Sequence, residues 1–291
     1  MYDSTYTGRF APTPSGPLHF GSIVAALGSF LQARKHQGRW LVRIEDIDEP
    51  RTKPGADKLI LEQLERLGLY WDGDIVYQSN RIHLYQSALK ILESESLVFS
   101  CSCSRKDTAN KPYPGTCRNK SIKIAGDHSI RLLTTNELIT LHDLVQGKYS
   151  QQLETDTGDF IIKRADGRFA YHLAVVVDDA EQSVTEIVRG IDLLDSTPRQ
   201  IYLQKKLGLS IPSYLHLPLA IDSPGNKLSK ATEAEAANTN DPVNTLLNAL
   251  TFLGQEPPKE LTSSNVHAVL NWAIENWNIK NIPAKKEITI I

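Results

Sequence analysis

The sequence predicts an α/β protein whose core is an open, doubly wound parallel sheet of the Rossmann type, with an insertion and a small helical C-terminal region. Two observations predict it. A strand-like, a helical and a second strand-like segment follow one another within the first 45 residues, which is typical of a βαβ unit. Helical patterns and short apolar strands then alternate along most of the chain. Because parallel strands need crossover connections, this alternation favours a parallel sheet.

The first βαβ unit is the most sharply patterned part of the chain. Residues 6–10 carry β-type side chains and precede a Pro/Gly turn at 11–18. From Ser22 onward apolar residues recur with helical spacing, and Gly38 suits the end of that helix. The apolar run within 39–45 then indicates a buried strand.

The remaining elements complete the expected architecture. Helices are predicted at 55–67, 80–95 and 194–207, and strands at 97–101, 172–177, 185–189 and 215–220. We expect an insertion around 100–165, two or three helices within 242–291, and no internal repeat. The predicted domains are a first catalytic half at 1–97, an insertion at 98–165, a second catalytic half at 166–232 and a helical C-terminal region at 233–291.

Composition is that of a globular protein with a sizeable core. The chain has 291 residues, of which 41% are hydrophobic and 23% charged. No run approaches the length of a membrane-spanning helix, and the N-terminus lacks the pattern of a secretion signal, so we expect a cytoplasmic protein.

The charge balance excludes a globally basic nucleic-acid binder. The 32 basic and 34 acidic residues give a net charge of −2, so a polynucleotide would need a local basic patch. Candidate clusters, which can equally be solvated surface, are Arg34-Lys35, Arg118/Lys120/Lys123, Lys163-Arg164 with Arg168, Lys205-Lys206 and Lys285-Lys286.

A nucleotide site is predicted at the turn between the first strand and the first helix. Ligands of open α/β sheets bind at the carboxyl ends of the strands, where this turn lies. Gly16 and Gly21 would let the backbone approach a ligand closely, and the helix start would offer N–H groups to phosphate. His19 could donate to a phosphate in the transition state. The alternative is a plain connector with a surface histidine.

A second string, Lys227-Leu-Ser-Lys230, follows a Pro-Gly-Asn turn about two hundred residues later. Two lysines on a loop could neutralise a departing pyrophosphate. The turn and this string together resemble the HIGH and KMSKS motifs of class I aminoacyl-tRNA synthetases, which implies ATP, with Mg²⁺, activating a carboxylate. Two positions depart from the motifs, since Ser22 replaces the second histidine and Ala231 replaces the last serine.

Four segments between the two strings resemble one branch of that class, the glutamyl-tRNA synthetases. They are Arg9–Gly16, Leu41–Asp48, Ala170–Ala174 and Val188–Asp192, and the likeness covers roughly residues 8–230. Glutamate has two carboxylates and one ammonium group, so a selective site needs two cations and one anion.

The resemblance implies a role for each residue of a glutamate site. It puts Glu45 on the amine and Arg9 and Arg189 on the carboxylates, and we favour Arg9 for the side-chain carboxylate. Tyr171 would add a hydroxyl donor. Phe10, Ala11, Pro12 and Thr13 belong to the same glutamate-binding segment. The alternatives are an acidic strand end at Glu45 and a surface ion pair at Arg189.

All three cysteines lie in one window of 17 residues, Cys101, Cys103 and Cys117. An odd count in a reducing compartment argues against disulfides, and three thiols suit tetrahedral zinc. Tyr113 or His128 would be the fourth ligand, and free thiols are the alternative. The Cys101, Cys103, Tyr113, Cys117 set resembles the site of the short paralogs of glutamyl-tRNA synthetase, which implies a structural zinc in an insertion facing tRNA.

Only 61 residues follow Lys230, too few for the anticodon-reading domains of a bacterial glutamyl-tRNA synthetase. The short paralogs share this feature. The resemblance implies that L-glutamate is activated without tRNA and then transferred to the queuosine base at the wobble position of tRNA(Asp). We expect a monomeric ligase. The alternatives are a minimal glutamyl-tRNA(Glu) synthetase and a catalytically silent RNA-binding paralog.

Overall fold

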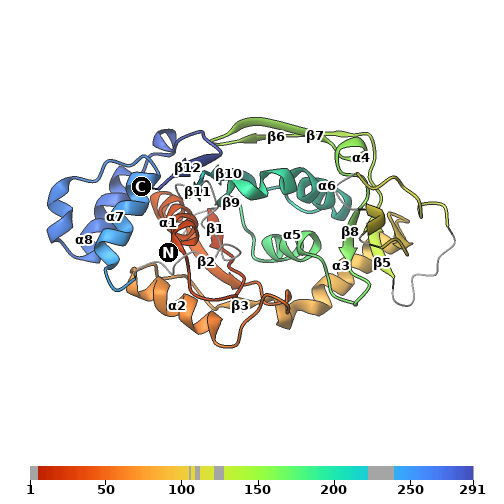
Figure 1. Ribbon diagram of the computed structural model, residues 1–291, viewed down its shortest axis with the longest axis horizontal. Helices are drawn as coiled ribbons and strands as arrows, with labels where there is room; N and C mark the ends of the chain where they lie inside the picture. The colour runs from red at the N-terminus through yellow and green to blue at the C-terminus, as the bar shows by residue number, and fades with distance from the viewer. Residues whose placement is uncertain (1–5, 105, 109–111, 121–127, 222–238, 291) are drawn as a thin grey trace.

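The protein folds around two neighbouring hydrophobic cores (Figure 1). The computed structural model describes residues 6–104, 106–108, 112–120, 128–221 and 239–290. One core joins the first βαβ unit to the C-terminal helices, and the other lies among the central helices and the insertion. Within the described residues, no helix combines the length and the apolar character that crossing a membrane requires.

The central sheet is parallel, as predicted, and consists of two parts. One part contains β1 (Thr7–Phe10), β2 (Arg39–Ile44) and β3 (Val76–Tyr77), and the other contains β9 (Glu186–Gly190) and β10 (Ser213–Leu217). The Thr185 N–H donates to the Thr7 carbonyl at 2.9 Å, so the two parts meet along β1 and β9. The resulting strand order, β3-β2-β1-β9-β10, reverses direction between β1 and β9. Such a reversal is where open α/β sheets bind ligands.

Helix α1 (Phe20–Lys35) connects β1 to β2 and packs against β1, β2 and β9. It begins two residues before the predicted start, so His19 becomes its N-cap. A Cβ at Gly28 would lie 2.8 Å from Leu217 Cδ1, which shows how closely the helix approaches the sheet. The other helices expected from the sequence are α2 (Ala56–Arg66), α3 (Ile82–Ser94) and α6 (Thr197–Leu207), and all three are present.

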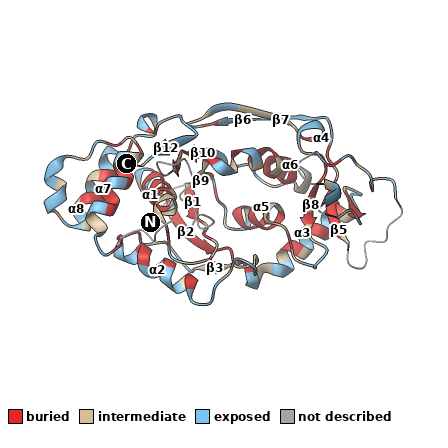
Figure 2. Cartoon of the chain, in the orientation of Figure 1, coloured by how far each residue is buried: buried red, intermediate tan, exposed pale blue. Residues whose placement is uncertain are grey.

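The prediction of a strand at 172–177 is wrong, because this segment is part of helix α5 (Tyr171–Glu181). The run Val175–Val177 is β-branched, which raises strand propensity. Residues 173–179 are all buried, so the helix shows no polar face that would reveal a helical period (Figure 2). The correction places Asp178 and Asp179 in the interior of the protein.

The insertion is antiparallel and reaches back to the central sheet. Its three-stranded sheet contains β4 (Val98–Cys101), β5 (Ser129–Leu132) and β8 (Phe160–Lys163). A long hairpin of β6 (Leu138–Asp143) and β7 (Gly147–Gln152) precedes the short helix α4 (Leu153–Asp156). The hairpin runs along one edge of the molecule, and its turn docks on β10 through a 2.9 Å bond from the Leu144 N–H to the Tyr214 carbonyl (Figure 1).

The C-terminal region contains the two helices α7 (Pro242–Phe252) and α8 (Val266–Asn276), which pack against α1. It also contains a strand that the sequence did not reveal, β12 (Glu287–Thr289), parallel to β11 (Leu219–Ile221). Three-residue strands are too short to show a period. The four domain boundaries stay predictions.

Candidate active site

A pocket of about 660 Å³ opens at the carboxyl ends of β1, β2, β9 and β10. It lies where the strand order reverses, the position that the sequence predicts for a ligand. The pocket brings together every residue predicted to bind glutamate and two of those predicted for ATP. They are Arg9, Phe10, Ala11, Pro12, Thr13, Glu45, Tyr171 and Arg189, with His19 and Gly21.

Three hydrogen bonds hold the turn at 11–18 in place. The Pro12 carbonyl accepts the Glu45 N–H at 3.0 Å, which ties the turn to the end of β2. The Leu18 N–H donates to the buried Gln63 side chain of α2 at 2.6 Å, and the Pro14 carbonyl accepts the Lys53 N–H at 2.8 Å. Gly16 has φ of +143°, which favours glycine, but it is not among the residues that line the pocket.

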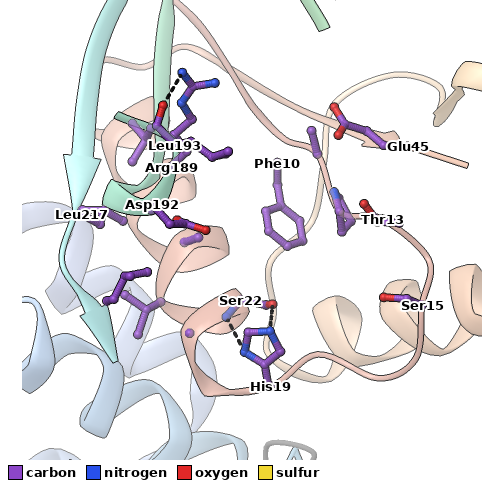
Figure 3. Close-up of a pocket in the computed structure, with 18 of the residues that line it drawn as sticks. Phe10, Thr13, Ser15, His19, Ser22, Glu45, Arg189, Asp192, Leu193 and Leu217 are labelled. Carbon is purple, nitrogen blue, oxygen red and sulfur yellow. Dashed lines mark hydrogen bonds between the residues drawn. The ribbon is translucent and has the colours of Figure 1, made fainter. Parts of the chain in front are cut away.

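His19 and Ser22 form a local cap at the start of α1 (Figure 3). His19 Nδ1 accepts the Ser22 N–H at 3.3 Å, and Nε2 lies 3.1 Å from the Ser22 hydroxyl. Because Nδ1 accepts a bond, the proton of the neutral ring is on Nε2. Ser22 occupies the position of the second histidine of the HIGH motif. Its contacts with both ring nitrogens orient His19.

Arg189 is a buried cation whose partners are all neutral. It is 5% exposed, and its Nη2 donates to Thr197 Oγ1 at 2.8 Å and to Gln200 Oε1 at 2.7 Å. Its Nε lies 3.1 Å from His216 Nε2. No ion pair among the described residues includes Arg189. A buried charge without a counter-ion is costly, so this arrangement favours binding of an anion from outside the chain.

Tyr171 extends the same anion-binding edge. Its hydroxyl lies 3.4 Å from Arg189 Nη1 at the first turn of α5. Burial raises the pKa of Tyr171, although Arg189 opposes that shift. The phenol therefore keeps its proton and can donate a hydrogen bond beside the guanidinium.

Arg9 and Glu45 belong to a buried ion network that the sequence did not reveal. Arg9 Nε lies 3.1 Å from Asp179 Oδ1, and Arg43 Nη1 lies 2.8 Å from the same oxygen. Arg43 Nη2 also approaches Glu45 Oε1 at 3.4 Å. Burial opposes ionisation of Asp179, but Arg9 and Arg43 hold the pKa of this carboxyl below its usual value. Asp179 therefore stays charged and fixes both arginines.

A second aspartate completes the charge balance of this network. Asp178 accepts from Arg81 Nε at 2.6 Å, from the Tyr85 hydroxyl at 2.7 Å and from Gln78 Nε2 at 2.8 Å. Three arginines thus face three carboxylates, Arg9, Arg43 and Arg81 against Asp178, Asp179 and Glu45. The network is neutral without any ligand, whereas Arg189 is not part of it.

Glu45 is the carboxylate of this network that faces the pocket. Burial raises the pKa of Glu45 against the opposing effects of Arg43 and Arg9. A buried carboxylate that is only partly compensated attracts an ammonium group. In Figure 3, Arg189 and Glu45 lie in the upper part of the view, and His19 lies below them, beyond Phe10. The pocket therefore extends from Arg189 and Glu45 to the turn at 11–18.

Lys227 and Lys230, predicted as catalytic, lie outside the described residues, as does Ala231. Sequence reasoning also missed the buried partners of the site, Arg43, Asp143, Asp178, Asp179 and His216. One signal was present, because two adjacent aspartates directly follow the apolar run of α5. Charged residues at the end of a buried element need partners, but the assignment of this run to a strand hid the helix that positions them.

The three cysteines meet at the edge of the insertion, as the sequence predicts. Their sulfur atoms all lie within 4.8 Å of one another, and those of Cys103 and Cys117 are 3.6 Å apart. The Tyr113 hydroxyl lies 3.4 Å from the sulfur of Cys101 and 4.0 Å from that of Cys103. Ligands about 2.3 Å from a tetrahedral zinc are roughly 3.8 Å apart, so four such donors fit this metal. His128, the alternative fourth ligand, is not part of this group among the described residues.

The cluster also contains a thiol that is easily ionised. Burial opposes ionisation of Cys117, but hydrogen bonds from Tyr113, the Ser102 N–H and the other two cysteines lower its pKa to about 6. Burial and neighbouring thiols raise the pKa of Cys103 to about 11. One sulfur is therefore a thiolate, the form that binds metals, at neutral pH.

Comparisons with known proteins agree with this geometry. Residues 6–281 match the catalytic domain of the class I tRNA synthetases (E and Q). A glutamyl-Q tRNA(Asp) synthetase of Vibrio parahaemolyticus is 49% identical over 98% of this chain and 96% of its own length. One of Thiobacillus denitrificans is 48% identical, with 97% of each chain covered. The chain belongs to the glutamyl-Q tRNA(Asp) synthetase family. It is therefore a ligase, and the family predicted from the sequence is confirmed.

Solved structures show the same fold. A glutamate-tRNA synthetase of Elizabethkingia anophelis superposes with a TM-score of 0.81 at 22% identity, covering 98% of this chain and 68% of that one. A glutamate tRNA ligase of Elizabethkingia meningosepticum, solved with its amino acid, gives a TM-score of 0.80 over 67% of its length. The class I synthetase fold expected from the sequence is thereby confirmed.

Proposed function

We propose that this ligase activates L-glutamate with ATP and transfers the glutamyl group to queuosine in tRNA(Asp). One observation carries the choice of amino acid. The pocket presents a buried guanidinium at Arg189 that has no counter-ion among the described residues, a second buried guanidinium at Arg9 and a partly compensated carboxylate at Glu45. Two cations and one anion complement two carboxylates and one ammonium group.

Each residue has a distinct task in binding. Glu45 accepts the ammonium group, and Arg189 with the Tyr171 hydroxyl receives one carboxylate. Arg9 receives the other carboxylate, the one on the side chain. The segment from Phe10 to Thr13, which includes the start of the turn at 11–18, also lines the pocket. Because Arg9 is held by Asp179, it offers its remaining N–H groups in a fixed direction.

The chemistry follows in two balanced steps. An α-carboxylate oxygen of glutamate attacks the α-phosphorus of ATP, and pyrophosphate leaves with its bond electrons. A hydroxyl of the cyclopentene-diol of queuosine then attacks the acyl carbon, loses its proton, and AMP leaves. His19 donates to phosphate, Gly21 lets the backbone approach it, and Gly16 shapes the turn. Lys227 and Lys230, with Mg²⁺ on the nucleotide, neutralise pyrophosphate.

The relatives support the choice of acceptor. Their name specifies tRNA(Asp), and the chain is nearly half identical to them along almost its whole length. The rivals are a minimal glutamyl-tRNA(Glu) synthetase and a silent RNA-binding paralog. Complete presence of the predicted pocket residues favours an active enzyme over the silent paralog. A cytoplasmic location and a monomeric state stay predictions.

A charging assay tests this function. Purified enzyme receives labelled glutamate, ATP and either tRNA(Asp) with queuosine, tRNA(Asp) without it, or tRNA(Glu). We expect labelling of the first RNA alone, and we expect it to persist after the 3′-terminal adenosine is removed. Labelling of tRNA(Glu), or loss of labelling on trimming, would show transfer to a terminal ribose instead. Absence of glutamate-dependent ATP–PPi exchange would favour the silent paralog.

We further propose one structural Zn²⁺ per chain at Cys101, Cys103, Tyr113 and Cys117. The convergence of three sulfurs and a phenol supports it. Metal analysis should give about one zinc per chain, and C117S should lose it. Full metal retention in C117S would contradict this assignment, whereas glutamate-dependent ATP–PPi exchange should survive in C117S because the residues of the cluster do not line the pocket.

A further inference from the structure

Arg189 is held from behind by a histidine that takes no part in lining the pocket. His216 on β10 is fully buried, and its Nε2 lies 3.1 Å from Arg189 Nε. The Nε of arginine always carries a hydrogen, so it must be the donor in this contact. His216 Nε2 must therefore be the unprotonated nitrogen of a neutral ring.

The other ring nitrogen explains why this tautomer prevails. His216 Nδ1 lies 2.6 Å from Asp143 Oδ2, and both side chains are fully buried. A carboxylate accepts only, so Nδ1 carries the ring proton and donates it. Burial and the nearby Arg189 lower the pKa of His216 in spite of Asp143, which keeps the ring neutral.

Asp143 is itself fixed, and it comes from the insertion. It ends strand β6, and its Oδ1 accepts the N–H groups of Val145 at 3.0 Å, Gln146 at 2.8 Å and His216 at 3.2 Å. The Gln146 side chain also donates to the His216 carbonyl at 2.9 Å. The hairpin turn of the insertion thus carries the group that sets the tautomer of His216.

The remaining donors of Arg189 show what this arrangement leaves for a ligand. Nη2 is occupied by Thr197 and Gln200, and Nε by His216. The Thr197 hydroxyl has two acceptors for its own hydrogen, the Leu193 carbonyl at 3.1 Å and His216 Nε2 at 3.2 Å, so it is an acceptor toward Arg189. Nη1, next to the Tyr171 hydroxyl, is the nitrogen left to face the pocket. These three acceptors, with the Leu193 carbonyl 3.4 Å from Nη2, therefore orient the plane of the guanidinium.

We propose that Asp143 and His216 are positioning residues for Arg189: Asp143 fixes the neutral tautomer of His216, and His216 aims the guanidinium at a carboxylate of the substrate. The proposal rests on the proposed function, in which Arg189 binds glutamate. It makes the hairpin of the insertion a structural part of the amino-acid site.

The isosteric variant D143N separates positioning from mere packing. An asparagine keeps an oxygen for the three backbone N–H groups and puts an NH₂ group opposite His216 Nδ1. His216 must then shift its proton to Nε2, which sets two N–H groups against each other at Arg189. An aspartate-to-asparagine change beside a histidine has this effect on the tautomer in serine proteases. Thr140→Ala is the control, because it removes only an exposed hydroxyl on the same strand and its hydrogen bond with Ser150.

The test combines kinetics with ¹⁵N NMR of the histidine rings. In D143N we expect the His216 tautomer to invert and the KM for glutamate in ATP–PPi exchange to rise about tenfold. We expect kcat to stay within about twofold and the KM for ATP to stay unchanged, because the chemistry at phosphate is not touched. T140A should match the wild type. An unchanged tautomer, or an inverted tautomer with unchanged KM, would overturn the proposal.

A second pair of variants keeps the test sharp if D143N folds poorly. H216Q retains an oxygen acceptor of similar reach for Arg189, whereas H216M offers only a weakly accepting sulfur. We expect the KM for glutamate to rise clearly less in H216Q than in H216M, and equal effects would overturn the proposal. Lack of exchange activity in the wild type would overturn the proposed function and this proposal with it, whereas normal wild-type exchange with unaffected variants overturns the positioning alone.

Discussion

Arg43 Nη2 and Glu45 Oε1 lie 3.4 Å apart, while the same guanidinium lies 2.8 Å from Asp179. The ion pair of Arg43 with Glu45 is therefore weaker than its ion pair with Asp179. This inequality explains why burial prevails at Glu45 and raises its pKa, while Asp179 keeps a lowered one. The pocket thus contains a poorly compensated carboxylate, Glu45, where an ammonium group is expected.

Glu45→Gln should therefore stabilise the ligand-free protein and abolish its activity. We expect a modest gain in stability at neutral pH, because burial disfavours the charged form of Glu45 more than Arg43 and Arg9 favour it. Because the folded pKa is raised, the stabilising contribution of Glu45 is complete below its unfolded value of 4.5 and is lost as pH rises. The advantage of the variant should thus vanish near pH 4 in thermal melts.

Glu62→Gln, an exposed substitution on α2, is the matched control and should change neither quantity. A destabilised E45Q at neutral pH would show that Arg43 needs all three of its acidic neighbours, Glu45, Asp178 and Asp179.

Arg189→Ala should leave the fold intact and remove glutamate activation. The arginine has no carboxylate partner among the described residues, so its removal leaves only neutral acceptors without their donor. We expect kcat/KM for glutamate to fall at least about 100-fold, the loss of two charge-assisted bonds, with an unchanged circular dichroism spectrum. R189K should fall nearly as far, because a tetrahedral ammonium group cannot reproduce the planar fork of donors that a guanidinium presents. An unfolded R189A would contradict this reasoning.

Gly158→Ala should lower metal content without touching a ligand. A Cβ at this position would lie 2.4 Å from both the backbone N and O of Tyr113, and φ is +67°. The tyrosine must therefore move away from the sulfurs. Gly167 has φ of +86° with open space around its Cβ, so G167A carries the strain without the clash. We expect a clear loss of zinc by metal analysis in G158A, and equal zinc in the two variants would refute the steric argument.

Cys117 should titrate near pH 6 in the metal-free protein. Its folded pKa lies below its ordinary value of 9.0, so its contribution to stability is present above pH 9 and lost as pH falls through about 6. Ultraviolet thiolate absorbance should show one step near pH 6 that C117S lacks, while the step of Cys103 comes near pH 11. A step near pH 6 that persists in C117S would assign it to another thiol.

The sequence predicted the pocket well because its residues follow strand ends. Arg9 and Arg189 are the next-to-last residues of β1 and β9, Glu45 directly follows β2, and the sheet brings such positions together. The partners of these residues could not be predicted in the same way. Asp179 depends on α5 being a helix, and Asp143 reaches His216 only through the docking of a hairpin 73 positions away along the chain. Those contacts arise from packing, which no local pattern records.

The three-residue strand β12 has a consequence for synthesis of the protein. Leu219 and Ala220 of β11 line the pocket, and within the described structure the strand paired with β11 is β12, at residues 287–289. On the ribosome the chain emerges from its N-terminus, so β11 must wait for its partner until residues 287–289 have been made. The first βαβ unit can form early, but this wall of the pocket is completed only after those residues emerge.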